Sequence, residues 1–87
     1  MRIRVRRTGG FAGIERTAEV DTSAVPDAVE FHTLAVAVLR EGGDDGRAGP
    51  DGFSYEITVD GETVRCCDPR LTAPQRALIT KVLKEGA

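Results

Sequence analysis

The chain has 87 residues, 40% of them hydrophobic and 30% charged, with twelve basic and fourteen acidic side chains and a formal net charge of -2 at pH 7. This size predicts a single domain over residues 1–87 with a thin core, and the charge balance argues against bulk binding of nucleic acid. No apolar run approaches the roughly 18 residues of a membrane span, so we expect a cytoplasmic protein with neither nucleic acid nor membrane as a partner.

Two alternating segments predict the first pair of antiparallel strands, over residues 2–8 and 14–20. In the first segment Ile3 and Val5 alternate with arginines, and in the second Ile14, Ala18 and Val20 stand at even positions between polar residues. This is the pattern of a half-buried strand. Two pairing registers are possible, and opposite charges across the strands favour one of them. The other register, shifted by two residues, would place Val5 against Arg16 and lose the pairing of arginines with acids. The favoured register pairs Arg2 with Asp21, Ile3 with Val20, Arg4 with Glu19 and Val5 with Ala18. It leaves a wide loop between the two strands.

Residues 28–40 predict a helix that ends at Gly42-Gly43. Pro26 suits its first turn, where a backbone N–H would have no partner in any case. The side chains predicted to face inward are Phe31, Ala35, Val38 and Leu39. Further apolar residues leave much of the remaining circumference apolar as well: Val29, Leu34 and Val36. The helix is therefore either deeply seated or part of a contact surface, a dimer interface included.

The second pair of strands has the clearest local signal. Apolar and polar residues alternate over residues 53–59, and Asp60-Gly61 is a two-residue hairpin turn. This turn sets a register that pairs Ile57 with Val64, Tyr55 with Cys66 and Ser54 with Cys67. Because successive strand residues point to opposite faces, we predict that Cys66 points into the core and Cys67 points outward.

The last predicted element is a helix that begins at the Thr72–Gln75 capping box and runs to about Glu85. Its inward stripe is Leu78, Ile79, Val82 and Leu83, and the side chains expected in solvent are Arg76, Lys81 and Lys84. The resulting order of elements is ββαββα. It predicts an α+β fold in which a four-stranded antiparallel sheet carries both helices on one face.

The chain offers no arrangement of residues that predicts catalysis or metal binding. His32 is the only histidine and has no partner at ligand spacing. Cys66 and Cys67 would lie on opposite faces of a strand, so they cannot easily share one ligand. The aspartates of the glycine-rich segment 41–52 lack the spacing of a calcium loop. We therefore expect a protein that is not an enzyme and has no metal or cofactor.

The glycine-rich run Gly9-Gly10-Phe11-Ala12-Gly13 is the leading candidate for a binding surface. A phosphate-binding loop of this kind would lead into a helix, whereas a strand is predicted to follow here. Phe11 has two interpretations. It folds back to plug the open end of the core, or it stands out as an apolar anchor for a partner's pocket.

Three parts of the chain resemble emfourin-type proteins, which are bacterial inhibitors of thermolysin-like zinc metallopeptidases such as protealysin. They are the opening strand with the Gly9–Gly13 run, the hairpin Phe53–Gly61 with Val64-Arg65, and the closing helix from Leu78 to Leu83. The resemblance implies tight, non-covalent, competitive inhibition of such a peptidase, and it supplies no catalytic residues.

A thermolysin-like metallopeptidase is accordingly the expected partner, with a monomer expected and a dimer through residues 28–40 left open. The residues expected at the partner are those of the loop, with two aspartates as a second contact: Gly9, Gly10, Phe11, Ala12, Gly13, Ile14, Asp44 and Asp45. Phe11 suits the specificity pocket of enzymes that prefer bulky apolar side chains, and the glycines let the backbone approach a cleft closely. The alternative is an interaction module without inhibitory activity that uses the same loop and the first helix.

Overall fold

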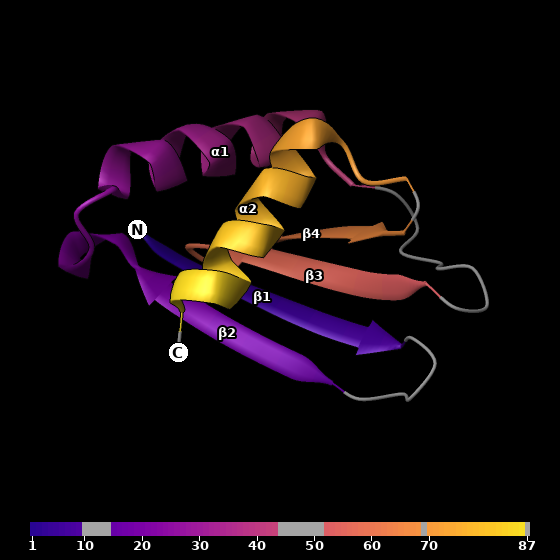
Figure 1. Cartoon of the computed structure of the whole chain (residues 1–87). Helices are drawn as coiled ribbons and strands as arrows, with labels where there is room; N and C mark the ends of the chain where they lie inside the picture. Colours follow the sequence, from indigo (N-terminus) through magenta and orange to yellow (C-terminus); the bar gives the residue numbers. More distant parts are fainter. Residues whose placement is uncertain (10–14, 44–51, 69, 87) are drawn as a thin grey trace.

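The structure is a computed structural model that describes residues 1–9, 15–43, 52–68 and 70–86. Its elements are β1 (Arg2–Gly9), β2 (Arg16–Asp21), a short 3-10 helix (Thr22–Ala24), α1 (Ala28–Glu41), β3 (Phe53–Val59), β4 (Glu62–Cys67) and α2 (Ala73–Glu85). The four strands form one antiparallel sheet in the order β2-β1-β3-β4 (Figure 1). The predicted α+β fold and its order of elements are confirmed.

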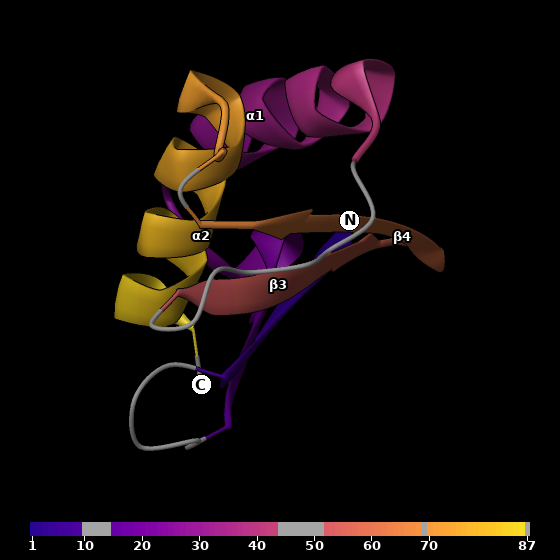
Figure 2. The same cartoon turned by 90° about the vertical axis from the view of Figure 1, so that its right-hand side faces the viewer.

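Both helices pack on one face of the sheet and share one core with it. α2 contacts β1 and β2, while α1 lies toward β4 and contacts α2 (Figure 1). The core cluster contains Ile3, Val5, Ala18, Val20, Phe31, Ala35, Val38, Tyr55, Ile57, Val59, Val64, Cys66, Leu78, Ile79 and Val82. Figure 2 shows that no helix covers the opposite face of the sheet within the described residues. Neither of the two described α-helices is long and apolar enough to cross a membrane.

The predicted register of the first hairpin is confirmed at every pair, but the expected charge pairs are not the ones recorded. Arg2 and Arg4 were expected to meet Asp21 and Glu19, whereas Arg2 Nε lies 3.3 Å from Glu19 Oε1. The Asp21 carboxylate instead accepts hydrogen bonds from the backbone and the hydroxyl of Ser23, at 3.0 and 2.7 Å. A long arginine side chain can reach a diagonal neighbour on the next strand. A short aspartate side chain instead accepts hydrogen bonds from residues that follow it closely in the chain.

The second hairpin has its predicted register and its predicted turn. Asp60 and Gly61 have φ angles of 48° and 90°, and both values are in the left-handed region that a type I′ turn requires. The turn is tied to the neighbouring strand, because the Arg2 N–H donates to Asp60 Oδ1 at 2.8 Å and the Asp60 N–H donates to the Arg2 carbonyl at 3.0 Å.

The helix boundaries are close to those expected. α1 begins at Ala28 as predicted, but Asp27 is its N-cap, so Pro26 precedes the helix rather than lying in its first turn. At α2 both halves of the predicted capping box form: the Gln75 N–H donates to Thr72 Oγ1, and the Gln75 side chain accepts from the Thr72 N–H.

The prediction that Lys81 lies in solvent is wrong. Its side chain is 16% exposed, and its ammonium group pairs with Asp27, with Glu30 at 3.4 Å and with Glu85 at 3.0 Å. The ammonium also lies 4.9 Å from the centre of the Phe31 ring. The hydrogen bonds that Lys81 donates to Asp27 and Glu85 raise the pKa of Lys81, and the bond that Asp27 accepts lowers the pKa of Asp27. Helical periodicity did not predict this, because the start of α1 supplies two of the three carboxylates.

Cys67 was predicted to point outward, away from the core, and the exposure that this implies is wrong. Cys67 lies opposite Ser54 as expected, yet it is fully buried. The chain turns back after β4, so that the Arg70 N–H donates to the Cys67 carbonyl at 3.0 Å and Arg70 Nη2 donates to Cys67 Sγ at 3.1 Å. The residues that follow the strand therefore help to cover a position that alternation alone would leave in water.

Candidate functional site

Gly9, which precedes residues 10–14, and Gly52, which follows residues 44–51, lie together at one end of the sheet. The pairing of β1 with β3 sets Gly9 opposite Phe53, and the pairing of β1 with β2 sets Arg7 opposite Arg16. We call the described residues 6–9, 15–16, 52–55, 67–68 and 70 the loop end; it lies at the right of Figure 1.

Of the predicted contact residues, the structure describes Gly9. Gly9 is exposed, has a φ of 88° and ends β1, and a Cβ placed on it would lie 3.2 Å from the Gly52 carbonyl oxygen. Both the backbone angle and the close neighbour favour glycine here. The other predicted residues lie outside the described part of the chain: Gly10, Phe11, Ala12, Gly13, Ile14, Asp44 and Asp45.

Arg7 and Phe53 form a contact at the loop end that the sequence did not predict. The Arg7 guanidinium carbon lies 4.4 Å from the centre of the Phe53 ring, which is the distance of a cation–π stack. The Phe53 ring in turn lies 6.3 Å from the Tyr55 ring, tilted by 55°. A signal was present, because alternation continues from Ile3 and Val5 to Arg7 and places this arginine on the helix-facing side of β1.

Asp68 fixes the start of β3. Its backbone N–H donates to the Phe53 carbonyl at 2.9 Å, and its carboxylate accepts from the Phe53 N–H at 3.3 Å. Burial and the nearby Asp68 charge raise the pKa of the Tyr55 hydroxyl, which stays neutral at physiological pH. The aromatic pair therefore sits on a backbone held from both sides.

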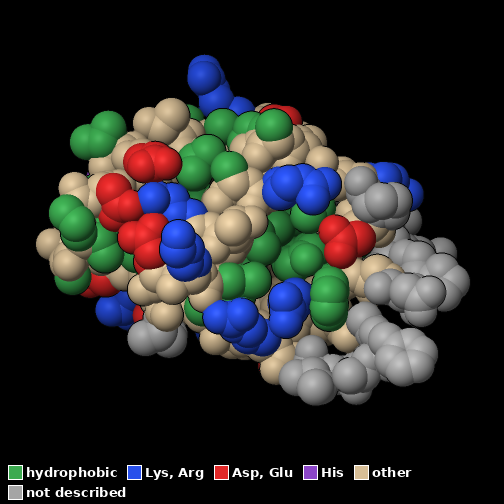
Figure 3. All heavy atoms as spheres, viewed as in Figure 1, with side chains coloured by type: hydrophobic (Ala, Val, Ile, Leu, Met, Phe, Trp, Pro, Cys, Tyr) green, Lys and Arg blue, Asp and Glu red, His purple; other side chains and the backbone are tan. Residues whose placement is uncertain are grey.

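The loop end is locally basic, although the whole chain is slightly acidic. Its described residues include four arginines, Arg6, Arg7, Arg16 and Arg70, against two acids, Glu15 and Asp68. Two of these arginines support the strands, since Arg6 Nη2 lies 2.9 Å from Glu15 Oε2 and Arg16 Nη2 donates to the Leu83 carbonyl at 2.6 Å. Figure 3 shows Lys and Arg side chains beside hydrophobic ones on the face that carries α2.

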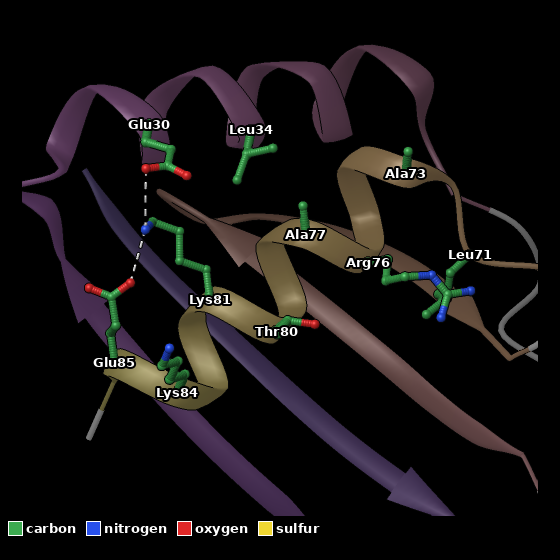
Figure 4. Close-up of a pocket in the computed structure, with 10 residues that line it drawn as sticks. All are labelled: Glu30, Leu34, Leu71, Ala73, Arg76, Ala77, Thr80, Lys81, Lys84 and Glu85. Carbon is green, nitrogen blue, oxygen red and sulfur yellow. Dashed lines mark ion pairs between the residues drawn. The ribbon is translucent and has the colours of Figure 1, made fainter.

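A second concave surface lies along the two helices. Leu34, Leu71 and Ala77 contribute its apolar part, and Arg76 and Lys84 contribute cations (Figure 4). Lys81 holds the acids of this groove in the ion pairs described above. Gly9, the predicted contact residue that the structure describes, is not among its lining residues.

The described residues contain no cluster of three or more histidine, cysteine, aspartate or glutamate side chains that could hold a metal ion. The single histidine has a structural contact, because His32 Nε2 lies 2.8 Å from the hydroxyl of the buried Thr22. The described residues of the loop end present the half-buried Phe53 ring and several arginines, which are residue types enriched where proteins bind one another.

Comparison with known proteins adds the family. The emfourin family model matches residues 5–83. This range includes every strand and α-helix apart from the first three residues of β1 and the last two of α2. No curated protein and no solved structure matches the chain. The match extends over far more than half of the 87 residues, and the chain therefore belongs to the emfourin family.

Proposed function

We propose that this protein is a non-covalent, competitive inhibitor of thermolysin-like zinc metallopeptidases and that it presents the Gly9–Gly13 loop to the peptidase cleft. Membership in the emfourin family supports the class of activity. The observation that carries the choice of surface is the placement of Gly9, which joins the loop to a strand paired along its length on both sides.

The physical argument concerns the cost of ordering the loop in a cleft. Six pairs join β1 to β2, so both ends of the loop are anchored before any partner binds. Anchored ends reduce the conformational entropy that is lost on binding. Phe11 supplies the one large apolar side chain of the run, and its glycine neighbours present little bulk to a narrow cleft. These features are typical of an anchor residue in a substrate-like segment.

The test is steady-state inhibition of thermolysin with a short peptide substrate. The wild-type protein is expected to raise the apparent KM and to leave kcat unchanged, because a competitive inhibitor occupies only the free enzyme. Phe11→Ala is expected to raise Ki by about 10- to 100-fold, the range of an interface hot spot. Circular dichroism and thermal unfolding check that the variant is folded. Equal Ki values for Phe11→Ala and wild type would remove Phe11 from the site.

Val29→Ala is the matched control on another surface. Val29 is 79% exposed on α1, so its truncation removes apolar area without disturbing the core. We expect its Ki to equal that of the wild type. A rise in Ki for Val29→Ala alone would move the contact to α1 and contradict the choice of the loop.

The two aspartates of the second proposed contact are tested separately. The double variant with Asp44→Asn and Asp45→Asn is expected to raise Ki only several-fold, because charges at the rim of an interface contribute little. An effect larger than that of Phe11→Ala would exchange the roles of the two loops.

The alternative function is a protein-interaction module without inhibitory activity. The exposure of Val29 and Val36 on α1, 79% and 46%, favours it, since large apolar side chains are exposed there. Binding of a catalytically inactive thermolysin without inhibition of the active enzyme would support this alternative. Size-exclusion chromatography with light scattering tests the expected monomer, and a concentration-dependent dimer would assign α1 to self-association.

A further inference from the structure

We propose that Arg7 and Phe53 form a fixed second contact for the peptidase beside the Gly9–Gly13 loop. The inference rests on the proposed function and extends it to residues that the structure describes. Phe53 receives an apolar side chain of the partner, and the Arg7 guanidinium receives an oxygen acceptor, either a backbone carbonyl or a carboxylate.

The placement of Arg7 is not explained by stability. Arg7 follows Ile3 and Val5 on the helix-facing side of β1, where an aliphatic residue would extend the core. Its Nε is buried without a hydrogen-bond partner, and an unpaired buried donor destabilises the fold. Sites where a sequence departs from the locally stable choice are often sites of function.

The other three arginines of the loop end form hydrogen bonds or ion pairs within the described residues, and Arg7 differs from them. Arg6 pairs with Glu15, and the guanidinium of Arg16 bonds to a carbonyl of α2. Arg70 Nη2 donates a hydrogen bond to Cys67 Sγ. The guanidinium of Arg7 stacks on Phe53 and forms no hydrogen bond or ion pair in the part of the chain that the structure describes. Within the described residues its two Nη groups therefore have donors left for a partner, while the buried Nε does not reach the surface.

Phe53 is held in place before any partner binds. Its backbone is paired with Gly9 and bonded twice to Asp68, and its ring is flanked by Arg7 and Tyr55. The side chain is only half-buried, so part of the ring is open to a partner. A fixed aromatic residue loses little conformational entropy on binding, which is the property of an anchor.

The location and charge of Arg7 and Phe53 indicate that they contact the same peptidase as the Gly9–Gly13 loop. Phe53 lies directly opposite Gly9, so a protein that contacts Gly9 also reaches the pair. Among the described residues of the loop end four arginines outnumber two acids, which suits oxygen acceptors such as carbonyls or carboxylates on the partner.

The test compares Arg7→Met and Phe53→Leu with wild type in the thermolysin inhibition assay, together with thermal unfolding. Arg4→Met is the matched control, because Arg4 lies on the same strand, faces the opposite side and is exposed. We expect Ki to rise about 10-fold or more for Arg7→Met and Phe53→Leu and to stay unchanged for Arg4→Met. We also expect Arg7→Met to unfold at the same or a higher temperature, since it removes the unpaired donor.

The outcomes separate this inference from the proposed function. If the wild type inhibits and Arg7→Met inhibits equally well, the second contact is wrong and the function stands. A rise in Ki that accompanies a lower unfolding temperature would overturn the contact as well, because a structural role explains it. Absence of inhibition by the wild type overturns the function and, with it, this partner.

A salt titration of Ki then identifies the acceptor. A salt dependence that is present in the wild type and absent in Arg7→Met assigns a carboxylate. A contact that Arg7→Met weakens equally at all salt concentrations assigns a backbone carbonyl. Both results support the proposed contact.

Discussion

The two ends of the sheet are built from the same strands but are closed in different ways. At the turn end, made of Met1–Arg2, Asp21–Ala24 and Asp60–Gly61, a two-residue turn and a short 3-10 helix satisfy the backbone locally. The Met1 carbonyl alone accepts from both the backbone and the hydroxyl of Thr22, at 2.9 and 3.1 Å. At the loop end, by contrast, the strand ends are joined by longer connections and Arg7 keeps an unpaired buried donor.

Under the proposed function, this difference separates stability from binding within one small protein. Short, fully bonded turns leave few groups for a partner, whereas longer loops on a rigid scaffold are where binding residues gather. The turn end is therefore expected to respond to mutation mainly in stability, and the loop end mainly in inhibition.

The largest expected contrast comes from inserting the dipeptide Gly-Ser at each end. Inserted between Asp60 and Gly61, it breaks the type I′ turn and the two hydrogen bonds to Arg2. At roughly 1 kcal/mol each, their loss lowers the free energy of unfolding by about 2 kcal/mol. Inserted after Gly13, the same dipeptide costs only a few tenths of a kcal/mol in loop-closure entropy. Urea unfolding measures both values.

The same pair of insertions should have the reverse effect on thermolysin. The insertion after Gly13 is expected to raise Ki, because it moves the loop relative to the sheet. The insertion at Asp60-Gly61 should leave Ki unchanged in the folded protein. Equal destabilisation by the two insertions would contradict the proposed difference between the ends.

Two glycines with nearly the same backbone angle give a finer comparison. Gly9 has a φ of 88° at the loop end, and Gly61 has a φ of 90° at the turn end. Alanine at either position adopts a left-handed conformation, which costs about 1–2 kcal/mol of unfolding free energy. Gly9→Ala is expected to cost slightly more, because its Cβ lies 3.2 Å from the Gly52 carbonyl, while nothing lies within 4 Å at Gly61.

Inhibition assays on the two glycine variants complete this prediction. Gly9→Ala should raise Ki and Gly61→Ala should not, although both lower the unfolding temperature. If both variants change Ki in proportion to their stability, the loop end has no special role in binding.

The smallest expected effects are those on two exposed carboxyl groups, one at each end. A hydrogen bond from Arg6 lowers the pKa of Glu15, and hydrogen bonds from the hydroxyl and backbone of Ser23 lower the pKa of Asp21. Each therefore contributes stability above its unfolded pKa of about 4, and this contribution is lost as the pH falls through the folded pKa.

Carboxyl titration by NMR distinguishes the two causes. Arg6→Gln should return the Glu15 pKa to its ordinary value and leave the Asp21 pKa lowered. Salt should weaken the Glu15 shift more than the Asp21 shift, because a side-chain ion pair is screened and a local turn is not. An Asp21 pKa that moves with Arg6→Gln would show that the two ends are electrostatically coupled.

The structural features that the sequence predicted are local ones. Alternation and the Asp60-Gly61 turn were sufficient for the β3–β4 register, and charge matching was sufficient for the β1–β2 register. The Thr72–Gln75 capping box likewise predicted the start of α2. Each depends on residues close together in the chain, whose hydrogen bonds and steric limits act in almost any tertiary context.

The candidate site was only partly accessible to the same reasoning. The glycine run marked one end of a hairpin, and the structure describes Gly9 of that run. The direction of Arg7 was not predicted, although extending the alternation of Ile3 and Val5 by one step gives it. Alternation could not indicate the stack on Phe53, which is 46 positions further along the chain.

What the sequence by itself determined is therefore the set of elements, the two hairpins and the family resemblance. Only the tertiary structure decided that β1 and β3 meet at the centre of the sheet, which brings Gly9 and Phe53 together. It also decided the burial of Lys81 against the start of α1 and the cover over Cys67. The physical reason is that these contacts join groups far apart in the chain, and their partners are selected by packing rather than by spacing.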